Sequence, residues 1–240
     1  MAGHSKWKNI QHRKGRQDAQ RGKLFNKLAR EIYVAACAGD KDPANNHQLR
    51  LAIAKAKAQN LPNENIERAI QKAMGGGEDE RYEHLFYEGY GPEGVAILVE
   101  VLTDNRNRTA ADVRHIFSKR GGNLGEAGCV AWMFERKGWL TIDRRDCSVE
   151  EEELLLLAVE SGVEDYETTI EGFELITSPE QFEIIKENME EKGIKFSDAE
   201  ITFLPSNRAP IREESLSSLY SLLEALSEHD DVQNVYANYV

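Results

Sequence analysis

The sequence predicts an α+β protein, and two observations support this class. From residue 23 to the glycines at 75–77, apolar residues recur every three to four positions, as they do in amphipathic helices. After three glycines at 75–77, the pattern changes to alternating and continuous apolar runs typical of strands, with further helical segments between them. The chain has 240 residues, of which 40% are hydrophobic and 30% charged, which is the composition of a folded rather than a disordered protein.

The N-terminal segment predicts a helical domain over residues 1–77 with a basic arm at its start. A helix is expected from Lys23 to about Gly39, with Leu24, Leu28 and Ile32 on its apolar face. A second helix fits 46–59. A third begins after Pro62 with Asn63 as the expected N-cap. Residues 1–22 carry neither the helical nor the strand period.

The next segment predicts paired strands at 84–90 and 94–103, then a helix that Thr109 and Asp112 cap, then a strand at 129–136. Near the C-terminus we expect a helix at 215–227 and a strand at 232–239. This last pair can complete the sheet of 84–136. The predicted second domain is therefore 78–137 plus 205–240.

The segment between these halves predicts a third, inserted domain over 138–204. Its expected order is a strand at 139–143, a helix from 148 to 162 capped by Ser148, strands at 165–170 and 173–177, a helix at 179–192, and a strand at 199–204. This βαββαβ order is typical of ferredoxin-like sandwiches. The chain is thus expected to hold two such α/β sandwich domains, one nested in the other.

Charge is unevenly distributed along the chain. The formal net charge is −12, yet residues 1–72 hold 15 basic and 6 acidic side chains, a net charge of +9. The remaining residues carry −21, and the inserted domain is strongly acidic. A basic end on an acidic protein indicates contact with nucleic acid or an anionic surface at that end. A merely solvated basic face is the alternative.

The candidate nucleic-acid contacts are basic side chains and one aromatic. Lys23, Lys27 and Arg30 fall on the face of the first helix opposite its apolar side, so we expect a solvent-facing basic stripe. Arg106 and Arg108 lie in the loop ahead of a helix N-terminus, where anions bind, unless they pair with nearby carboxylates. The predicted contacts are Lys6, Trp7, Lys8, Arg13, Lys14, Arg16, Arg21, Lys23, Lys27, Arg30, Arg106 and Arg108.

Short motifs of a recognisable set are spread along the chain: MAGHSKW (1–7), HRK (12–14), RGKLF (21–25), NIERAI (65–70), YEGYGP (87–92), LTDNRNRT (102–109), GGNLG (121–125) and DVQNVY (231–236). Together these motifs resemble the YebC/PmpR family, and the resemblance runs from residue 1 to about 239. Departures from the usual family pattern include Gln11 and Gln48, which remove two basic side chains, together with His47, Glu93 in place of a glycine, and Cys129 in place of a serine.

The resemblance implies three domains and a cytoplasmic protein described as a probable DNA-binding transcriptional regulator. It also implies an alternative, because a mitochondrial relative activates translation and bacterial relatives have been tied to ribosomes. In that alternative the partners are ribosomal or transfer RNA and ribosomal proteins, and the protein assists elongation.

An enzyme acting on nucleic acid is a third possibility. Glu100, Asp104 and Asp112 are carboxylates suited to Mg²⁺, but their spacing matches no recognised site. Gly89 to Gly94 matches a dinucleotide-binding pattern, yet it lies between two strands and opens no helix. We therefore predict no catalytic residue, metal, cofactor or small-molecule substrate. The sequence likewise predicts no secretory signal, membrane span or disulfide.

Overall fold

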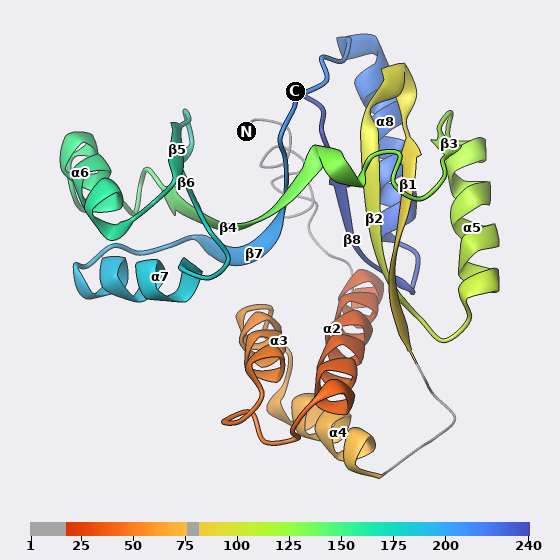
Figure 1. Ribbon diagram of the computed structural model, residues 1–240, viewed down its shortest axis with the longest axis horizontal. Coiled ribbons are helices and arrows are strands. Elements are labelled where there is room, and N and C mark those ends of the chain that lie inside the picture. Colours follow the sequence, from red (N-terminus) through yellow and green to blue (C-terminus); the bar gives the residue numbers. More distant parts are fainter. Residues whose placement is uncertain (1–17, 76–81) are drawn as a thin grey trace. The chain divides into compact units, whose positions relative to one another are not determined.

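The computed structural model describes residues 18–75 and 82–240 (Figure 1). The predicted α+β class is confirmed: within these residues helices accompany two four-stranded antiparallel sheets. Residues 133–207, here called the inserted segment, form one compact unit, and the other described residues form the second. No helix in either described range combines the length and hydrophobicity that crossing a membrane requires.

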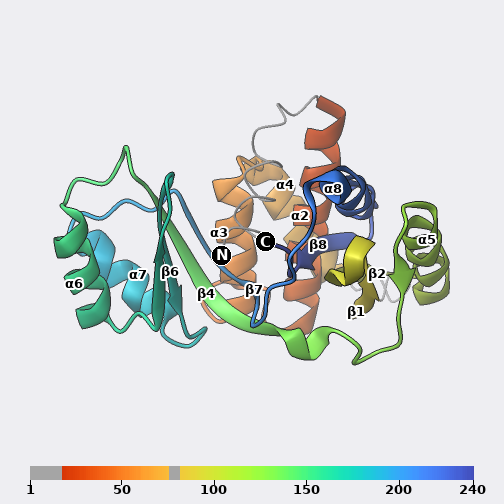
Figure 2. The same ribbon diagram turned by 90° about the horizontal axis from the view of Figure 1, so that it is seen from above.

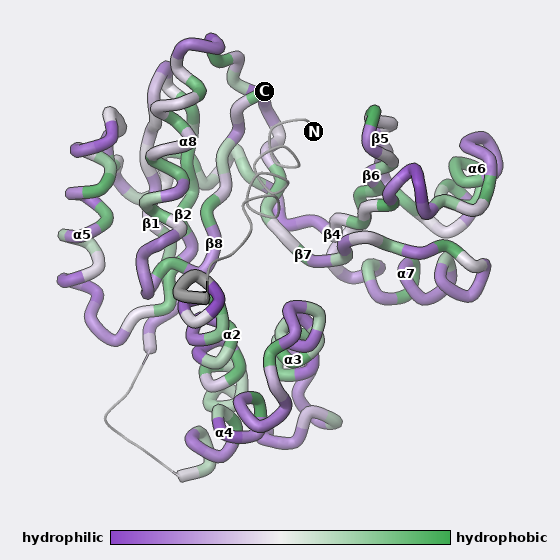
Figure 3. The backbone as a smooth tube through the Cα atoms, turned by 180° about the vertical axis from the view of Figure 1, so that it is seen from behind, coloured by the Kyte–Doolittle hydropathy of each residue, from purple (hydrophilic) through white to green (hydrophobic). Residues whose placement is uncertain are grey.

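The helical bundle consists of α2 (Asp18–Ala38), α3 (His47–Ala58) and α4 (Asn63–Met74). Its buried core is rich in alanine, so the helices can approach closely around Leu28 and Ile32. Asn46 caps α3 by accepting a 3.0 Å hydrogen bond from the Leu49 N–H. Figure 3 shows hydrophobic and hydrophilic residues alternating around α2, as its amphipathic sequence requires.

Two helix starts in the bundle differ from the sequence prediction. Helix α2 begins at Asp18 rather than Lys23, because its first turn is polar and gives no apolar periodicity. Asn63 is the first residue of α4 rather than its cap, and Pro62 precedes it without any side-chain cap. The proline fixes a backbone angle compatible with the helix entry, which makes a capping side chain dispensable.

The first sheet contains β1 (Glu83–Tyr90), β2 (Ala96–Thr103), β3 (Asn123–Leu124) and β8 (Val232–Ala237). Its strand order is β3-β1-β2-β8. Helices α5 (Arg106–Lys119) and α8 (Glu213–Ser227) pack together on one face (Figure 1). Phe117 of α5 and Leu222 of α8 meet Val99 and Val101 of β2 in a fully buried core.

The structure does not contain the strand predicted at 129–136 of the first sheet, and this prediction is corrected here. The chain there forms a short 3-10 helix, η2 (Ala131–Met133), followed by a ten-residue strand of the other sheet. The Glu88 carboxylate accepts 2.7 Å hydrogen bonds from the backbone N–H groups of Gly128, Val130 and Ala131. These donors are therefore not available for a strand ladder, and the two-residue β3 occupies the sheet edge instead.

The second sheet lies within the inserted segment and contains β4 (Phe134–Asp143), β5 (Asp165–Thr168), β6 (Gly172–Thr177) and β7 (Asp198–Pro205). The strand order is β5-β6-β4-β7, and α6 (Glu151–Ser161) and α7 (Phe182–Glu191) cover one face (Figure 2). The α6 cap is Glu150 rather than the expected Ser148. The chain order is thus βαββαβ, nested between strands of the first sheet.

The turn between β1 and β2 contains Glu93, at a position where the resemblance implies a glycine. Glu93 lies in the short 3-10 helix η1 (Pro92–Gly94) with φ of 58°, a region that favours glycine. Its carboxylate accepts hydrogen bonds from the Arg212 backbone N–H (3.1 Å) and Nε (2.8 Å), and from the Ser215 hydroxyl. These contacts tie the turn to the start of α8 and offset the backbone strain.

Candidate nucleic-acid interface

The predicted contact residues fall into three groups. Arg21, Lys23, Lys27 and Arg30 lie on α2, while Arg106 and Arg108 lie in the first turn of α5. One member of each group, Arg30 and Arg108, pairs with the same carboxylate, Asp231. The third group lies outside the described residues and comprises Lys6, Trp7, Lys8, Arg13, Lys14 and Arg16.

The basic stripe of α2 contacts the C-terminal end of α8. The Lys23 ammonium donates to the Glu228 carbonyl (3.1 Å) and the Lys27 ammonium donates to the Ser227 carbonyl (2.6 Å). Arg30 donates to the carbonyls of Leu102 (3.1 Å) and Asp230 (3.0 Å). The last carbonyls of a helix lack partners within it and carry partial negative charge, so cations are favourable there.

The predicted exposure to solvent is therefore wrong for Lys27 and Arg30. The prediction that Lys23, Lys27 and Arg30 lie on the same face of α2 is correct. Arg21 and Lys23 are exposed, whereas Lys27 and Arg30 are partly buried. Burial lowers the pKa of Lys27 to about 8, partly offset by Asp230, while Lys23 and Arg30 nearby lower it further. Periodicity identified the face of the helix but not the surface that covers it.

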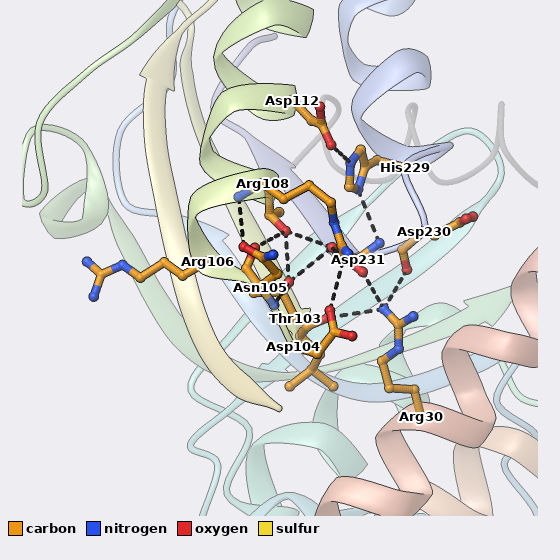
Figure 4. Close-up of polar contacts among 12 residues, drawn as sticks. Arg30, Thr103, Asp104, Asn105, Arg106, Arg108, Asp112, His229, Asp230 and Asp231 are labelled. Atoms are coloured by element: carbon orange, nitrogen blue, oxygen red, sulfur yellow. Dashed lines mark hydrogen bonds and ion pairs between the residues drawn. The ribbon is translucent and has the colours of Figure 1, made fainter. Parts of the chain in front are cut away.

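Asp231 is the acceptor at the centre of this contact (Figure 4). Its carboxylate, 5% exposed, accepts from Arg30 (2.9 Å) and Arg108 (3.1 Å), and from the hydroxyls of Thr109 (2.7 Å) and Thr103 (3.1 Å). Burial alone would raise the pKa of Asp231, but the hydrogen bonds from Thr109, Arg108 and Thr103 and the charge of Arg30 lower it overall. The carboxylate stays ionised and links α2 to α5.

The predicted anion site ahead of α5 differs in its details. The helix starts at Arg106, three residues before the expected Thr109, and Asn105 caps it by accepting from the Arg108 N–H (3.1 Å). Arg108 pairs with Asp104 (2.8 Å) as well as Asp231, as the alternative reading anticipated. Arg106 is exposed, and Figure 4 shows its side chain pointing away from the cluster.

The three carboxylates weighed as magnesium ligands each have other partners. Glu100 accepts from His84 (2.8 Å), Asn234 (2.7 Å) and Tyr236 (2.7 Å). Burial opposes ionisation of Glu100, but these hydrogen bonds lower its pKa to about 2. Asp104 pairs with Arg108, and Asp112 lies 3.3 Å from His229. Over 18–75 and 82–240, no group of three or more His, Cys, Asp or Glu side chains is placed to hold a metal ion.

Sequence reasoning missed the partners of the basic stripe. Asp231 follows the predicted helix 215–227 and opens the DVQNVY motif. The available signal was the pair Asp230 and Asp231 between the end of this helix and the apolar strand. Sequence order gives no indication that residues 200 positions apart meet. The bundle also contains a groove between α2 and α4, which was not predicted from the sequence motifs.

Comparison with known proteins identifies relatives along the whole chain. A family model for the TACO1/YebC protein N-terminal domain matches residues 5–76, and one for the TACO1/YebC second and third domain matches 82–239. A protein of Geobacillus thermodenitrificans named "probable transcriptional regulatory protein" is 60% identical over 99% of this chain and 96% of its own length. One of the same name from Carboxydothermus hydrogenoformans is 55% identical over 100% of this chain and 98% of its own length.

A solved structure is also similar. The crystal structure of a conserved hypothetical protein from Aquifex aeolicus superposes with a TM-score of 0.83 at 49% sequence identity. The match covers 96% of this chain and 95% of that one.

Proposed function

Because the chain belongs to the TACO1/YebC family, whose relatives here are named probable transcriptional regulatory proteins, we propose that it is a non-enzymatic, cytoplasmic regulator that binds DNA through its basic helical domain. The three-domain division, 1–77, 78–137 plus 205–240, and 138–204, is part of the proposal. The observation that carries it is the charge of +9 in residues 1–72 of a chain whose net charge is −12. Basic side chains that contact phosphates release counterions and give affinity that is sensitive to salt.

The contacts between α2 and α8 suggest a division of roles along the basic stripe. Arg21 and Lys23 are exposed and remain accessible to a phosphate. Lys27 and Arg30 hold α2 against the carbonyls after α8 and against Asp231. We assign phosphate contact to Arg21, Lys23 and the basic residues of 1–17, whereas Lys27 and Arg30 make no phosphate contact and position α2.

Arg106 and Arg108 also have separate roles, one in phosphate contact and one in positioning. The Arg106 side chain is exposed and points away from the Asp231 cluster, so it is the better placed of the two for a phosphate (Figure 4). Arg108 is committed to Asp104 and Asp231. We assign phosphate contact to Arg106 and a positioning role to Arg108.

The test is DNA affinity after reversal of exposed charge. In fluorescence anisotropy with a labelled duplex, R21E/K23E is expected to bind about tenfold more weakly than wild type, because two potential phosphate contacts become repulsive. The matched control is K186E/K195E in the inserted segment, which reverses the same number of charges and is expected to bind within about twofold of wild type. Equal losses in both variants, or full affinity in R21E/K23E, would overturn the proposal.

A further inference from the structure

A groove in the helical bundle runs between α2 and α4 and has a volume of about 320 Å³. This is at the low end of the roughly 300–1,000 Å³ typical of small-ligand sites. Its lining includes three aromatic and three cationic side chains: Phe25, Tyr33, Tyr82, Arg30, Arg68 and Lys72. Among the described residues that line it, none is acidic, so the groove favours an anionic ligand with a flat, partly apolar body.

The aromatic and cationic groups are already ordered against one another. The Tyr33 and Tyr82 rings meet edge to face, with centroids 5.9 Å apart and planes at 77°. The Arg30 guanidinium lies over the Tyr82 ring at 5.1 Å, and the Lys72 ammonium lies over the Tyr33 ring at 5.3 Å. Asp231 holds Arg30 from outside the groove. A guanidinium fixed on a ring is a platform on which a nucleobase can stack.

Two amide side chains add hydrogen-bonding capacity. Asn26 lines the groove from α2 and Asn65 lines it from α4. Each amide offers a donor and an acceptor, the combination that matches the polar edge of a base. A hydrocarbon chain would use neither amide, so the lining fits a polar base better than a lipid chain.

The cations of α4 are placed for a phosphate. Arg68 and Lys72 are one helical turn apart and therefore share a face. Arg68 pairs with Glu64 at 2.7 Å, but both side chains are at least 70% exposed. An exposed pair of this kind contributes little, so Arg68 can exchange its partner for a phosphate oxygen at small cost.

We propose that this groove binds one unpaired nucleotide, with its base stacked at Arg30 and the neighbouring aromatic side chains and its phosphate at Arg68 and Lys72. The inference deepens the proposed function and rests on it, because the nucleotide belongs to the DNA strand that the basic domain binds. The volume admits a single nucleotide rather than a duplex edge. Recognition of this type responds to an extruded base rather than to sequence in a groove of DNA.

The test compares two duplexes of one sequence, one fully paired and one with a single bulged 2-aminopurine. Wild type is expected to bind the bulged duplex about tenfold more tightly and to quench 2-aminopurine fluorescence by stacking. R68A is expected to lose most of that preference while it retains affinity for the paired duplex. R50A is the matched control, since Arg50 is an exposed arginine of α3 outside the groove, and it should retain the full preference.

Each alternative result points to a different failure. If both duplexes bind equally and fluorescence does not change, the groove does not take a base, while DNA binding itself stands. If neither duplex binds, the proposed function fails together with the inference. If free adenosine monophosphate binds as tightly as the bulged duplex, the ligand is a free nucleotide and not part of a strand. Equal loss of preference in R68A and R50A would place the site elsewhere.

Discussion

The helical bundle and the inserted segment use their charges differently. Lys23, Lys27 and Arg30 of the bundle reach partners between 72 and 205 residues away along the chain. Ion pairs of the inserted segment join its own residues, such as Lys137 with Glu164 and Arg145 with Asp143. The basic side chains of the bundle therefore hold it against distant parts of its own unit. The ion pairs of the inserted segment lie at its surface and join only its own residues.

The hydrophobic cores of the bundle and of the inserted segment differ in the size of their side chains. Six of the buried residues of the bundle core are alanines, whereas large side chains such as Leu154, Phe173 and Phe182 fill the core of the inserted segment. Burial of apolar area stabilises in proportion to its size, so each of these large side chains contributes more than a buried alanine does. The bundle adds polar contacts with the end of α8 and the residues that follow it.

The largest expected effect comes from the core of the inserted segment. Leu154 is fully buried, so L154A should lower the free energy of unfolding by about 3–4 kcal/mol through lost apolar contact and a new cavity. In the bundle, A52G removes one buried methyl group and should cost only about 1 kcal/mol. Urea unfolding followed by circular dichroism measures both changes. Similar costs for the two variants would remove the contrast between the cores.

Removal of Asp231, the buried acceptor between α2 and α5, should lower the free energy of unfolding. D231A leaves Arg30, Arg108 and two threonine hydroxyls without their shared partner, and should cost about 2–3 kcal/mol. The control is R145A, which breaks the exposed Arg145–Asp143 pair and should cost less than about 0.5 kcal/mol. Urea unfolding followed by circular dichroism compares them. A cost for D231A as small as that for R145A would show that the contact does not stabilise the bundle.

Lys27 should make the contact dependent on pH. Its folded-state pKa of about 8 lies below the ordinary 10.5, so between these values the unfolded state binds more protons and stability rises with pH. The stability of wild type relative to K27M should therefore rise by about 2 kcal/mol from pH 8 to pH 10.5. The control K57M, at an exposed position of α3, should show a flat difference across the same range. A stability difference between K27M and wild type that stays constant across this range would contradict the burial of a charged lysine.

Periodicity and turn residues predicted most of the fold. The apolar faces of α2 and α5, the β1–β2 hairpin and the βαββαβ order of the second sheet follow from local patterns. The strand at 129–136 was assigned to the wrong sheet, because Glu88, some 40 residues earlier, binds the backbone there. Local patterns carry no information about such a partner.

The candidate site was predictable only in part. Composition identified the basic helix, and spacing identified which side chains share a face. Neither could show that Lys27 and Arg30 meet the end of α8, or that Tyr82 from beyond the bundle completes a groove with Tyr33. These contacts depend on how distant segments pack.

The most direct test of DNA binding by the basic domain is lysine footprinting with and without DNA. Acetylation of the intact protein, read by mass spectrometry at saturating duplex, needs no variant. We expect protection of Lys23 and of Lys6, Lys8 and Lys14, with unchanged modification of Lys186, Lys192 and Lys195 in the inserted segment. Protection of the inserted-segment lysines alone, or of no lysine at saturation, would contradict it.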